Sequence, residues 1–352
     1  MNSLLEFYKN KTVLILGHTG FKGSWLTKIL SLAGANVIGY SLDAPTNPNL
    51  FSILSLQNQI VSIIGDIRDL QKLNLVFDKY QPEIVFNLAA QPLVRESYKN
   101  PVYTYDVNIM GIVNICESIR LHNCVKSFVN ITTDKVYENH DWKNHYFTED
   151  EKLDGYDPYS NSKSCSELVT HAYYKSFLKE KNIAVSTARA GNILGGGDFS
   201  ADRLIPDTIR ALEHNNELTI RNPNSSRPYQ HVLDALACYL LIAKLQYLDK
   251  NLSGAYNVGP DQDEIITNIK LINLFKQYIN NLKYISLDDN TGPHEAIYLA
   301  LNTDKAKLLL NWHPKLSIKQ AVKLTAEWYQ AWLDGDNLIL LTEKQIKEFF
   351  ND

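Results

Sequence analysis

A tyrosine and a lysine stand four residues apart near the middle of the chain, at Tyr159 and Lys163. On a helix this spacing puts a phenol and an ammonium on one face. Asp157 and Pro158 are favourable N-cap and N1 residues, which places Tyr159 in the first helical turn. The ammonium of Lys163 would favour the phenolate and lower the Tyr159 pKa from about 10 toward neutral pH. Such a pair suits removal of a proton from an alcohol while a hydride leaves its carbon.

Hydroxyl and charged residues precede this pair in the stretch 132–137, Thr-Thr-Asp-Lys-Val-Tyr. A hydroxyl from Thr132 or Thr133 could share a substrate hydroxyl with Tyr159. Tyr-x-x-x-Lys pairs also occur by chance on exposed helix surfaces, so the pair alone does not establish an active site. The elements that would have to position these side chains decide between the two interpretations.

The composition is that of a large globular protein. The 352 residues are enough for a sizeable core and two lobes. The contents of 45% hydrophobic and 21% charged residues are ordinary for a globular protein. A net charge of −4 without a long basic run argues against a nucleic-acid partner. We expect no signal peptide, because residues 1–10 lack a basic region followed by an apolar core. We expect no membrane partner, because no apolar run approaches the roughly 20 residues that span a bilayer.

The cysteines show no paired or metal-type spacing. We therefore expect reduced thiols in a cytoplasmic protein and no metal site. The four are Cys116, Cys124, Cys165 and Cys238.

A glycine-rich turn follows the first apolar run of the chain. Residues 12–16 form a short β-branched run typical of a buried parallel strand, and 24–33 follow a helical pattern. Between them, Gly17, Gly20 and Gly23 allow a tight turn, close approach of the backbone to a pyrophosphate, and close helix-on-strand packing. The helix N-terminus would then offer free N–H groups to a phosphate. The alternative is a loop that only connects strand to helix.

Strand and helix patterns continue to alternate, which predicts an α/β fold with a doubly wound parallel sheet. After residue 190 the alternation becomes irregular, and Gly195–Gly197 mark a change of lobe. We expect a nucleotide-binding domain at 1–190 and a smaller mixed α/β substrate lobe at 191–352, with some C-terminal segments returning to the first domain. Further strands are expected at 36–40, 60–64, 83–88, 127–131 and 183–188, and helices at 70–80, 103–121 and 158–180.

Ligands of such sheets bind at the carboxyl ends of the strands. Gly65-Asp66-Ile67 follows the third strand and could hold an adenine. Leu88-Ala89-Ala90-Gln91 follows the fourth, with small residues that let a cofactor lie close. The end of the second strand, 40–43, carries no Lys or Arg to bind a ribose 2′-phosphate, so NAD is favoured over NADP.

These features together resemble the extended short-chain dehydrogenase/reductase superfamily, in its order and at its spacing. The similarity rests on the glycine triplet, Asn87-Leu88-Ala89-Ala90, the Thr133 region and the Tyr159–Lys163 pair. More narrowly, nine stretches resemble the family of CDP-glucose 4,6-dehydratases and together cover nearly the whole chain. They are residues 17–26, 89–95, 133–139, 155–163, 189–199, 202–207, 221–232, 293–296 and 311–314.

The resemblance implies a Rossmann-type fold and dehydration of CDP-glucose to CDP-4-dehydro-6-deoxyglucose with internal recycling of NAD. Tyr159 would take the proton of the sugar 4-hydroxyl as hydride passes to NAD⁺, while Thr133 positions that hydroxyl. Lys163 would hold the nicotinamide ribose. Asp134, protonated at that moment, would protonate the departing 6-hydroxyl. The cofactor contacts that we expect are Gly17, Gly20, Phe21, Gly23, Asp66, Ile67, Leu88, Ala89, Ala90, Tyr159 and Lys163.

Lys135 departs from the pattern of the dTDP-glucose relatives, in which a Glu after this Asp resembles a base for C5. A Lys at this position resembles the CDP-glucose group. It could serve as the base if burial or neighbouring cations lowered its pKa, or it could steady an enolate. The remaining alternative is a solvated Lys in a loop.

Substrate contacts are expected mainly from the second half of the chain. Asn192 resembles the residue that binds the diphosphate or the sugar, and a guanidinium matches phosphate oxygens in pairs. For any single arginine here, a surface ion pair is the alternative. The candidates are Gln91, Arg95, Asn192, Arg203, Arg221, Arg227 and His231.

Two other functions stay open. One is a dehydratase for a dTDP-, UDP- or GDP-sugar, or a 4-epimerase, and Asp134 with Lys135 favours dehydration over epimerisation. The other is a non-catalytic NAD-binding regulator, which would not need an intact Thr133, Tyr159 and Lys163. By analogy with the superfamily, the helices 103–121 and 158–180 would form a homodimer or homotetramer.

Overall fold

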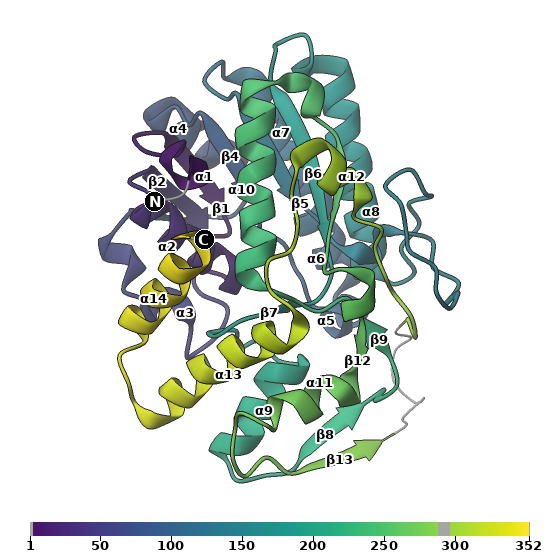
Figure 1. Cartoon of the computed structure of the whole chain (residues 1–352). Coiled ribbons are helices and arrows are strands. Elements are labelled where there is room, and N and C mark those ends of the chain that lie inside the picture. Colours follow the sequence, from purple (N-terminus) through teal and green to yellow (C-terminus); the bar gives the residue numbers. More distant parts are fainter. Residues whose placement is uncertain (1–2, 288–295, 352) are drawn as a thin grey trace.

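A computed structural model describes residues 3–287 and 296–351. Of the stretch 293–296, Pro293, His294 and Glu295 therefore lie outside the described residues. The core of the fold is a seven-stranded, all-parallel sheet in the order β11-β6-β5-β4-β1-β2-β3 (Figure 1). This confirms the predicted α/β class. Its strands are β1 (Thr12–Leu16), β2 (Asn36–Ser41), β3 (Val61–Ile64), β4 (Ile84–Asn87), β5 (Ser127–Ile131), β6 (Ala184–Ala190) and β11 (Ala255–Val258).

Both faces of the sheet are buried, as apolar parallel strands require. Val13 and Ile15 of β1 belong to one hydrophobic cluster, and Leu14 and Leu16 belong to the other. One face is covered by α2 (Phe21–Leu32) and α10 (Val232–Leu248); the other by α4 (Leu70–Tyr80), α7 (Gly111–Leu121) and α8 (Pro158–Tyr173).

The strand order reverses around β1, which lies between β2 and β4. At such a switch point a crevice opens at the carboxyl ends of the strands. Gly17 follows β1 and Leu88 follows β4, and the Leu88 N–H donates to the Leu16 carbonyl at 2.8 Å. The sheet thus brings the glycine turn and the small residues after β4 to one edge.

Helix boundaries differ from the predicted ones at the glycine turn. The helix begins at Phe21 rather than Ser24, because Gly20 already takes an extended N-cap conformation. Gly23 then lies inside the helix against Gly17, where a Cβ atom would come within 2.0 Å of the Gly17 carbonyl oxygen. The turn and the first helical residues are therefore one tight unit.

The two long helices predicted at 103–121 and 158–180 are present, each with a π-helical turn. α6 (Pro101–Tyr105) continues through a π-turn at Asp106–Met110 into α7, and α8 continues into a π-turn at Tyr174–Leu178. Shorter helices are α1 (Ser3–Glu6), α3 (Leu50–Ile53) and α5 (Val94–Lys99), and 3-10 turns occur at Leu56–Asn58, Asp134–Val136, Lys250–Leu252 and Gln262–Glu264.

The chain beyond residue 190 contributes to both lobes. β11 and α10 belong to the central sheet and its cover, whereas small two-stranded sheets and helices build the second lobe below it (Figure 1). The elements of the second lobe are α9 (Leu204–Glu213), α11 (Asn268–Phe275), β8 (Leu218–Arg221) with β13 (Tyr284–Leu287), and β9 (Ser226–Arg227) with β12 (Ile266–Thr267). β7 (Ile193–Leu194) pairs with β10 (Gln230–His231) between the lobes, and α12 (Asp304–Leu310) packs beside β11 and α10 of the larger lobe.

The last two helices, α13 (Ile318–Asp334) and α14 (Leu338–Asn351), return to the N-terminal half (yellow beside purple in Figure 1). Glu343 of α14 forms an ion pair with Lys28 of α2 at 2.8 Å. Trp328 of α13 packs over Gly196, whose carbonyl accepts a hydrogen bond from Trp25 Nε1 at 3.0 Å. None of the described helices is long and apolar enough to cross a bilayer.

Candidate active site

A cavity of about 300 Å³ between the two lobes collects most of the predicted site residues. All five catalytic candidates line it: Thr133, Asp134, Lys135, Tyr159 and Lys163. The cofactor candidates Phe21, Leu88 and Ala90 line it, as do the substrate candidates Arg95, Asn192, Arg203, Arg221 and Arg227. Residues more than 200 positions apart in sequence, such as Phe21 and Arg227, therefore line one cavity.

The turn after β5 positions three of the catalytic candidates. β5 ends at Ile131, and Thr133 is the extended N-cap of a single 3-10 turn at Asp134–Val136. The hydroxyl of Thr133 accepts from the Lys135 N–H at 3.4 Å and donates to Asp134 Oδ1 at 3.1 Å. Because the chain turns so tightly here, the consecutive residues Thr133, Asp134 and Lys135 can all line the same cavity.

The first turn of α8 positions the other two. Asp157 caps the helix by accepting from the Ser160 N–H at 3.0 Å, and Pro158 occupies the first helical position, as predicted. Tyr159 and Lys163 are both buried one turn apart. Lys163 Nζ donates to the Ile131 carbonyl at 3.2 Å, which ties α8 to the end of β5.

The predicted lowering of the Tyr159 pKa by Lys163 is wrong for this structure. Burial raises the pKa of Tyr159 to about 12, and the opposing effects come from a hydrogen bond with Thr133 and the charge of Arg203. Burial also lowers the pKa of Lys163 to about 8, although the Glu167 carboxylate raises it. The loss of hydration at the phenol outweighs the benefit of a nearby cation.

Asp134 has the electrostatics of a general acid. Burial raises its pKa to about 6, against the opposing effects of Lys135, Thr133 and Arg227. Its Oδ2 atom has no hydrogen-bond partner among the described residues. A Cβ atom on Gly191 would approach Oδ2 within 2.9 Å, so this glycine leaves room for the carboxyl. The group can therefore be protonated near neutral pH and donate that proton.

Lys22, which the sequence did not single out, is a second amine in the cavity. The residue is half-buried, yet its ammonium lies deep enough that burial lowers its pKa to about 7. The charges of Lys163 and Arg203 lower this pKa further, while Asp134 and Asp198 raise it. The signal in the sequence that could have found it is a lysine between Gly20 and Gly23, at the start of the helix that follows the glycine turn.

The glycine turn has the shape required to hold a dinucleotide. Gly17 has φ +87°, and a Cβ atom there would lie 2.7 Å from the Ala89 nitrogen. No side chain caps the N-terminus of α2, so its first N–H groups remain available for a phosphate. Asp66 and Ile67 stand at the end of β3 outside the main cavity: Asp66 pairs with Arg68 at 2.7 Å and Ile67 is buried.

Four arginines line the part of the cavity nearest the second lobe. Arg203 pairs with Asp198 at 2.7 Å, and Arg221 pairs with Asp202 at 3.1 Å. Arg95 lies 3.8 Å from the same Asp202. Arg227 is buried and donates to the Ser226 carbonyl at 2.9 Å. This concentration of guanidinium groups fits a diphosphate.

Two predicted substrate contacts are not brought to this cavity. Gln91 is buried and donates to Thr104 Oγ1 at 2.9 Å, which fixes the chain after β4. His231 is fully buried, and its Nδ1 accepts from the Leu233 N–H at 3.3 Å at the start of α10. Burial lowers the His231 pKa to about 3. Both side chains support the framework around the cavity.

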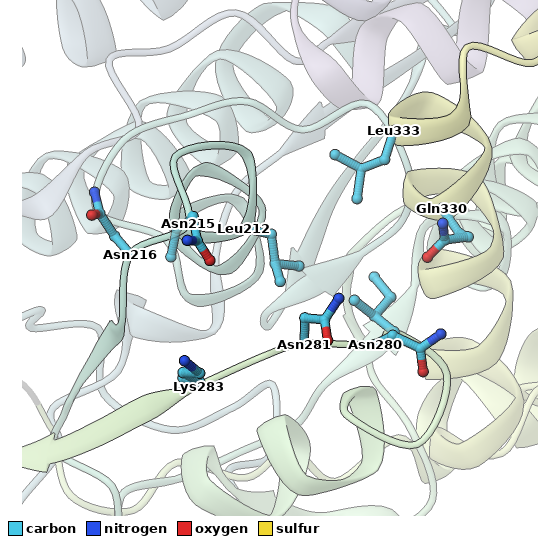
Figure 2. Close-up of a pocket in the computed structure, with 10 residues that line it drawn as sticks. Leu212, Asn215, Asn216, Asn280, Asn281, Lys283, Gln330 and Leu333 are labelled. Atoms are coloured by element: carbon cyan, nitrogen blue, oxygen red, sulfur yellow. The ribbon is translucent and has the colours of Figure 1, made fainter.

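A second cavity of about 320 Å³ lies between α9, α13 and the chain before β13 (Figure 2). Its lining includes the amide side chains of Asn215, Asn216, Asn281 and Gln330, and Lys283 is the only ionisable group among the described residues that line it. With no acid or base partner for that lysine in its lining, the cavity lacks the groups for proton transfer. In the described part of the chain, no cluster of three or more His, Cys, Asp or Glu residues could hold a metal ion.

Comparisons with known proteins agree with this geometry. Residues 14–325 match the family model described as GDP-mannose 4,6 dehydratase. The chain is 42% identical to a CDP-glucose 4,6-dehydratase of Salmonella typhimurium, over 98% of both chains. It is 27% identical to the human dTDP-D-glucose 4,6-dehydratase, over 91% of this chain and 90% of that one.

Solved structures share the fold at lower sequence identity. A UDP-glucose 4-epimerase of Thermotoga maritima superposes with a TM-score of 0.78 at 22% identity, covering 92% of this chain and 99% of that one. A dTDP-glucose 4,6-dehydratase of Bacillus anthracis, in complex with NAD, gives 0.76 at 23% identity, covering 94% and 99%. On the match to the family model and the full-length similarity to the Salmonella enzyme, the chain belongs to the 4,6-dehydratase family that this model describes.

Proposed function

We propose that this protein dehydrates CDP-glucose to CDP-4-dehydro-6-deoxyglucose with NAD as a recycled cofactor. The observation that supports dehydration most directly is Asp134, a buried carboxyl whose pKa is raised to about 6 beside Thr133. A 4-epimerase moves protons and hydride at C4 alone and has no use for this second acid. The choice of a CDP-sugar is supported by the 42% identity to the Salmonella enzyme.

Tyr159 and Thr133 would carry the oxidation at C4. Tyr159 would take the proton of the 4-hydroxyl, for which it must first be deprotonated against the burial that raises its pKa to about 12, and the Thr133 hydroxyl would hold the substrate oxygen in place. Thr133 and Arg203 both favour the phenolate against the effect of burial. Bound NAD supplies the hydride acceptor for C4 and the hydride donor for C6. Lys163 would hold the nicotinamide ribose from its place one turn along α8.

Asp134 and Lys135 would carry the loss of water. The 4-ketone acidifies the C5 hydrogen, so the 6-hydroxyl can leave once it is protonated. Asp134 supplies that proton, and its raised pKa keeps a useful fraction protonated near neutral pH. Lys135 follows it directly and lines the same cavity, so its amine is our candidate to accept the C5 proton or to stabilise the enolate.

The test is to incubate the purified protein and NAD separately with CDP-, dTDP-, UDP- and GDP-glucose. Mass spectrometry then looks for a product lighter by one water. We expect this product from CDP-glucose. Reaction of another sugar but not of CDP-glucose would refute the substrate assignment. Binding of NAD with no reaction of any sugar would favour a non-catalytic role, and a product of unchanged mass would indicate an epimerase.

We further propose a cytoplasmic homodimer or homotetramer formed through the helices 101–121 and 158–178. Large apolar side chains are exposed along them, including Val102 at 82%, Leu168 at 55%, Met110 at 47% and Phe177 at 44%. Pairing these helices with those of a second copy would bury this surface in a four-helix bundle. All four cysteines are free, which suits a reducing compartment.

A further inference from the structure

The cavity that holds Tyr159 also extends along the first turn of α9 to β8, which we call its far end. Arg203, directly before α9, is close enough to Tyr159 for its charge to lower the Tyr159 pKa. Asp207 lies one turn further along α9, and its Oδ2 atom is 3.8 Å from Nη2 of Arg221 on β8. A nucleotide sugar is extended, with the sugar, diphosphate, ribose and base in order. If the sugar binds at Tyr159 and the diphosphate at the arginines, the base would be placed near Asp207, which lines the same cavity.

Two side chains at the far end have hydrogen-bonding capacity that the described part of the protein does not use. Asp207 Oδ1 accepts from Arg210, whereas Oδ2 lies 3.8 Å from Arg221 Nη2, beyond hydrogen-bond distance. Oδ2 accepts no other hydrogen bond from the described residues. Thr219 on β8 is exposed, and its hydroxyl makes no hydrogen bond with them either. Both residues line the cavity.

Other polar side chains at this end are already occupied. Asn268 also lines the cavity, but its Oδ1 accepts from Tyr229 Oη at 2.7 Å and its Nδ2 donates to the Asn222 carbonyl at 2.9 Å. The guanidinium of Arg221 is paired with Asp202 at 3.1 Å and suits a phosphate better than a base. Asp207 and Thr219 are therefore the pair with free capacity for a nucleobase.

We propose that Asp207 and Thr219 select cytosine, with Asp207 Oδ2 accepting from the N4 amine and the Thr219 hydroxyl donating to N3. A carboxylate only accepts hydrogen bonds, and cytosine offers a donor at N4, whereas uracil and thymine present a carbonyl oxygen there. A uracil would place this oxygen against the carboxylate. The inference rests on the proposed function for its assumption that the nucleotide is a CDP-sugar.

The test is calorimetric binding of CDP and UDP to the NAD-loaded protein and to Asp207→Asn, which keeps the shape but adds a donor. We expect wild type to prefer CDP, and the ratio of the UDP to the CDP dissociation constant to fall at least tenfold in Asp207→Asn. Asp202→Asn is the matched control. It also removes a carboxylate paired with Arg221, and it should change both affinities by the same factor.

Thr219→Val provides an independent variant, because it keeps the side-chain shape and leaves every ion pair intact. We expect it to weaken CDP binding and lower the same ratio. An unchanged ratio in both Asp207→Asn and Thr219→Val, or an equal fall in Asp202→Asn, would overturn the inference. The binding experiment needs no turnover. Failure of CDP-glucose dehydration alongside a retained CDP preference would refute the proposed reaction and leave the base assignment standing.

Discussion

The hydroxyl of Thr133 donates a hydrogen bond to Asp134 Oδ1 at 3.1 Å. In the reaction that we propose, the side chain that positions the sugar 4-hydroxyl would thereby also orient the acid that protonates the leaving 6-hydroxyl. Asp134 Oδ2 stays without a partner among the described residues, so the carboxyl keeps one oxygen for the substrate. We therefore propose that this contact links the group that acts in the oxidation to the group that acts in the dehydration.

Thr133→Val should impair both halves of the reaction. It removes the hydroxyl that contacts Asp134 and favours the Tyr159 phenolate, so we expect kcat/KM for CDP-glucose to fall about 100-fold or more. Thr133→Ser keeps the hydroxyl and is the matched control, with activity within about tenfold of wild type. Steady-state kinetics of both variants test this, and normal turnover by Thr133→Val would contradict it.

Asp134→Asn should separate the two halves. The amide cannot donate a proton to a leaving hydroxyl, so dehydration should slow by about 10²–10⁴-fold while oxidation at C4 persists. The absorbance of reduced nicotinamide should then accumulate after mixing with CDP-glucose, and mass spectrometry should find little product lighter by one water. If Asp134→Asn dehydrates the substrate at the wild-type rate, Asp134 is not the acid that protonates the leaving 6-hydroxyl.

The same substitution should make the protein more stable at alkaline pH. The folded pKa of Asp134 is raised from 3.8 to about 6, so its contribution to stability is fully present below 3.8 and is lost as pH rises through about 6. A shift of about two pKa units corresponds to about 3 kcal/mol. We expect Asp134→Asn to have a higher Tm than wild type at pH 8 and nearly the same Tm at pH 4. Equal Tm values of the two proteins at pH 8 would show that the buried, ionised carboxylate of Asp134 does not destabilise the folded protein.

The proposed subunit contact through the exposed apolar face of α8 can be tested by introducing one charged residue there. Leu168→Glu places a carboxylate where we propose a helix from another subunit, and burying an unpaired charge is costly. We expect a lower oligomeric state by analytical ultracentrifugation. Leu340→Glu is the control, because Leu340 is similarly exposed at 64% but lies on α14. If the wild-type protein is monomeric, the proposed homodimer or homotetramer is wrong.

Local sequence signals predicted the parts of the site that local structure creates. Tyr159 and Lys163 share a helix face because Asp157 and Pro158 start that helix. Thr133 faces the cavity because an apolar strand ends two residues before it. These relationships span a few residues, so periodicity and capping rules were sufficient to find them.

Long-range packing decided what the sequence could not predict. The pKa of Tyr159 depends on how deeply both lobes bury the phenol, and the helix spacing to Lys163 carries no such information. His231 lies in a matched motif, yet its ring is enclosed beside Trp25, more than 200 residues away in sequence. The low pKa of Lys22 likewise depends on burial and on the charges of Lys163 and Arg203, which are far from it in sequence.

The return of α13 and α14 to the N-terminal half has a consequence for biosynthesis. Residues of both helices belong to the same hydrophobic cluster as Trp25 and Leu26 of α2. A ribosome adding about 5–20 residues per second needs roughly 10–30 s to pass from residue 190 to residue 351. During that interval the nascent phosphate-binding half is complete in sequence but lacks its cover. Its folding is therefore expected to finish only once α13 and α14 have been synthesised, with apolar surface exposed to chaperones until then.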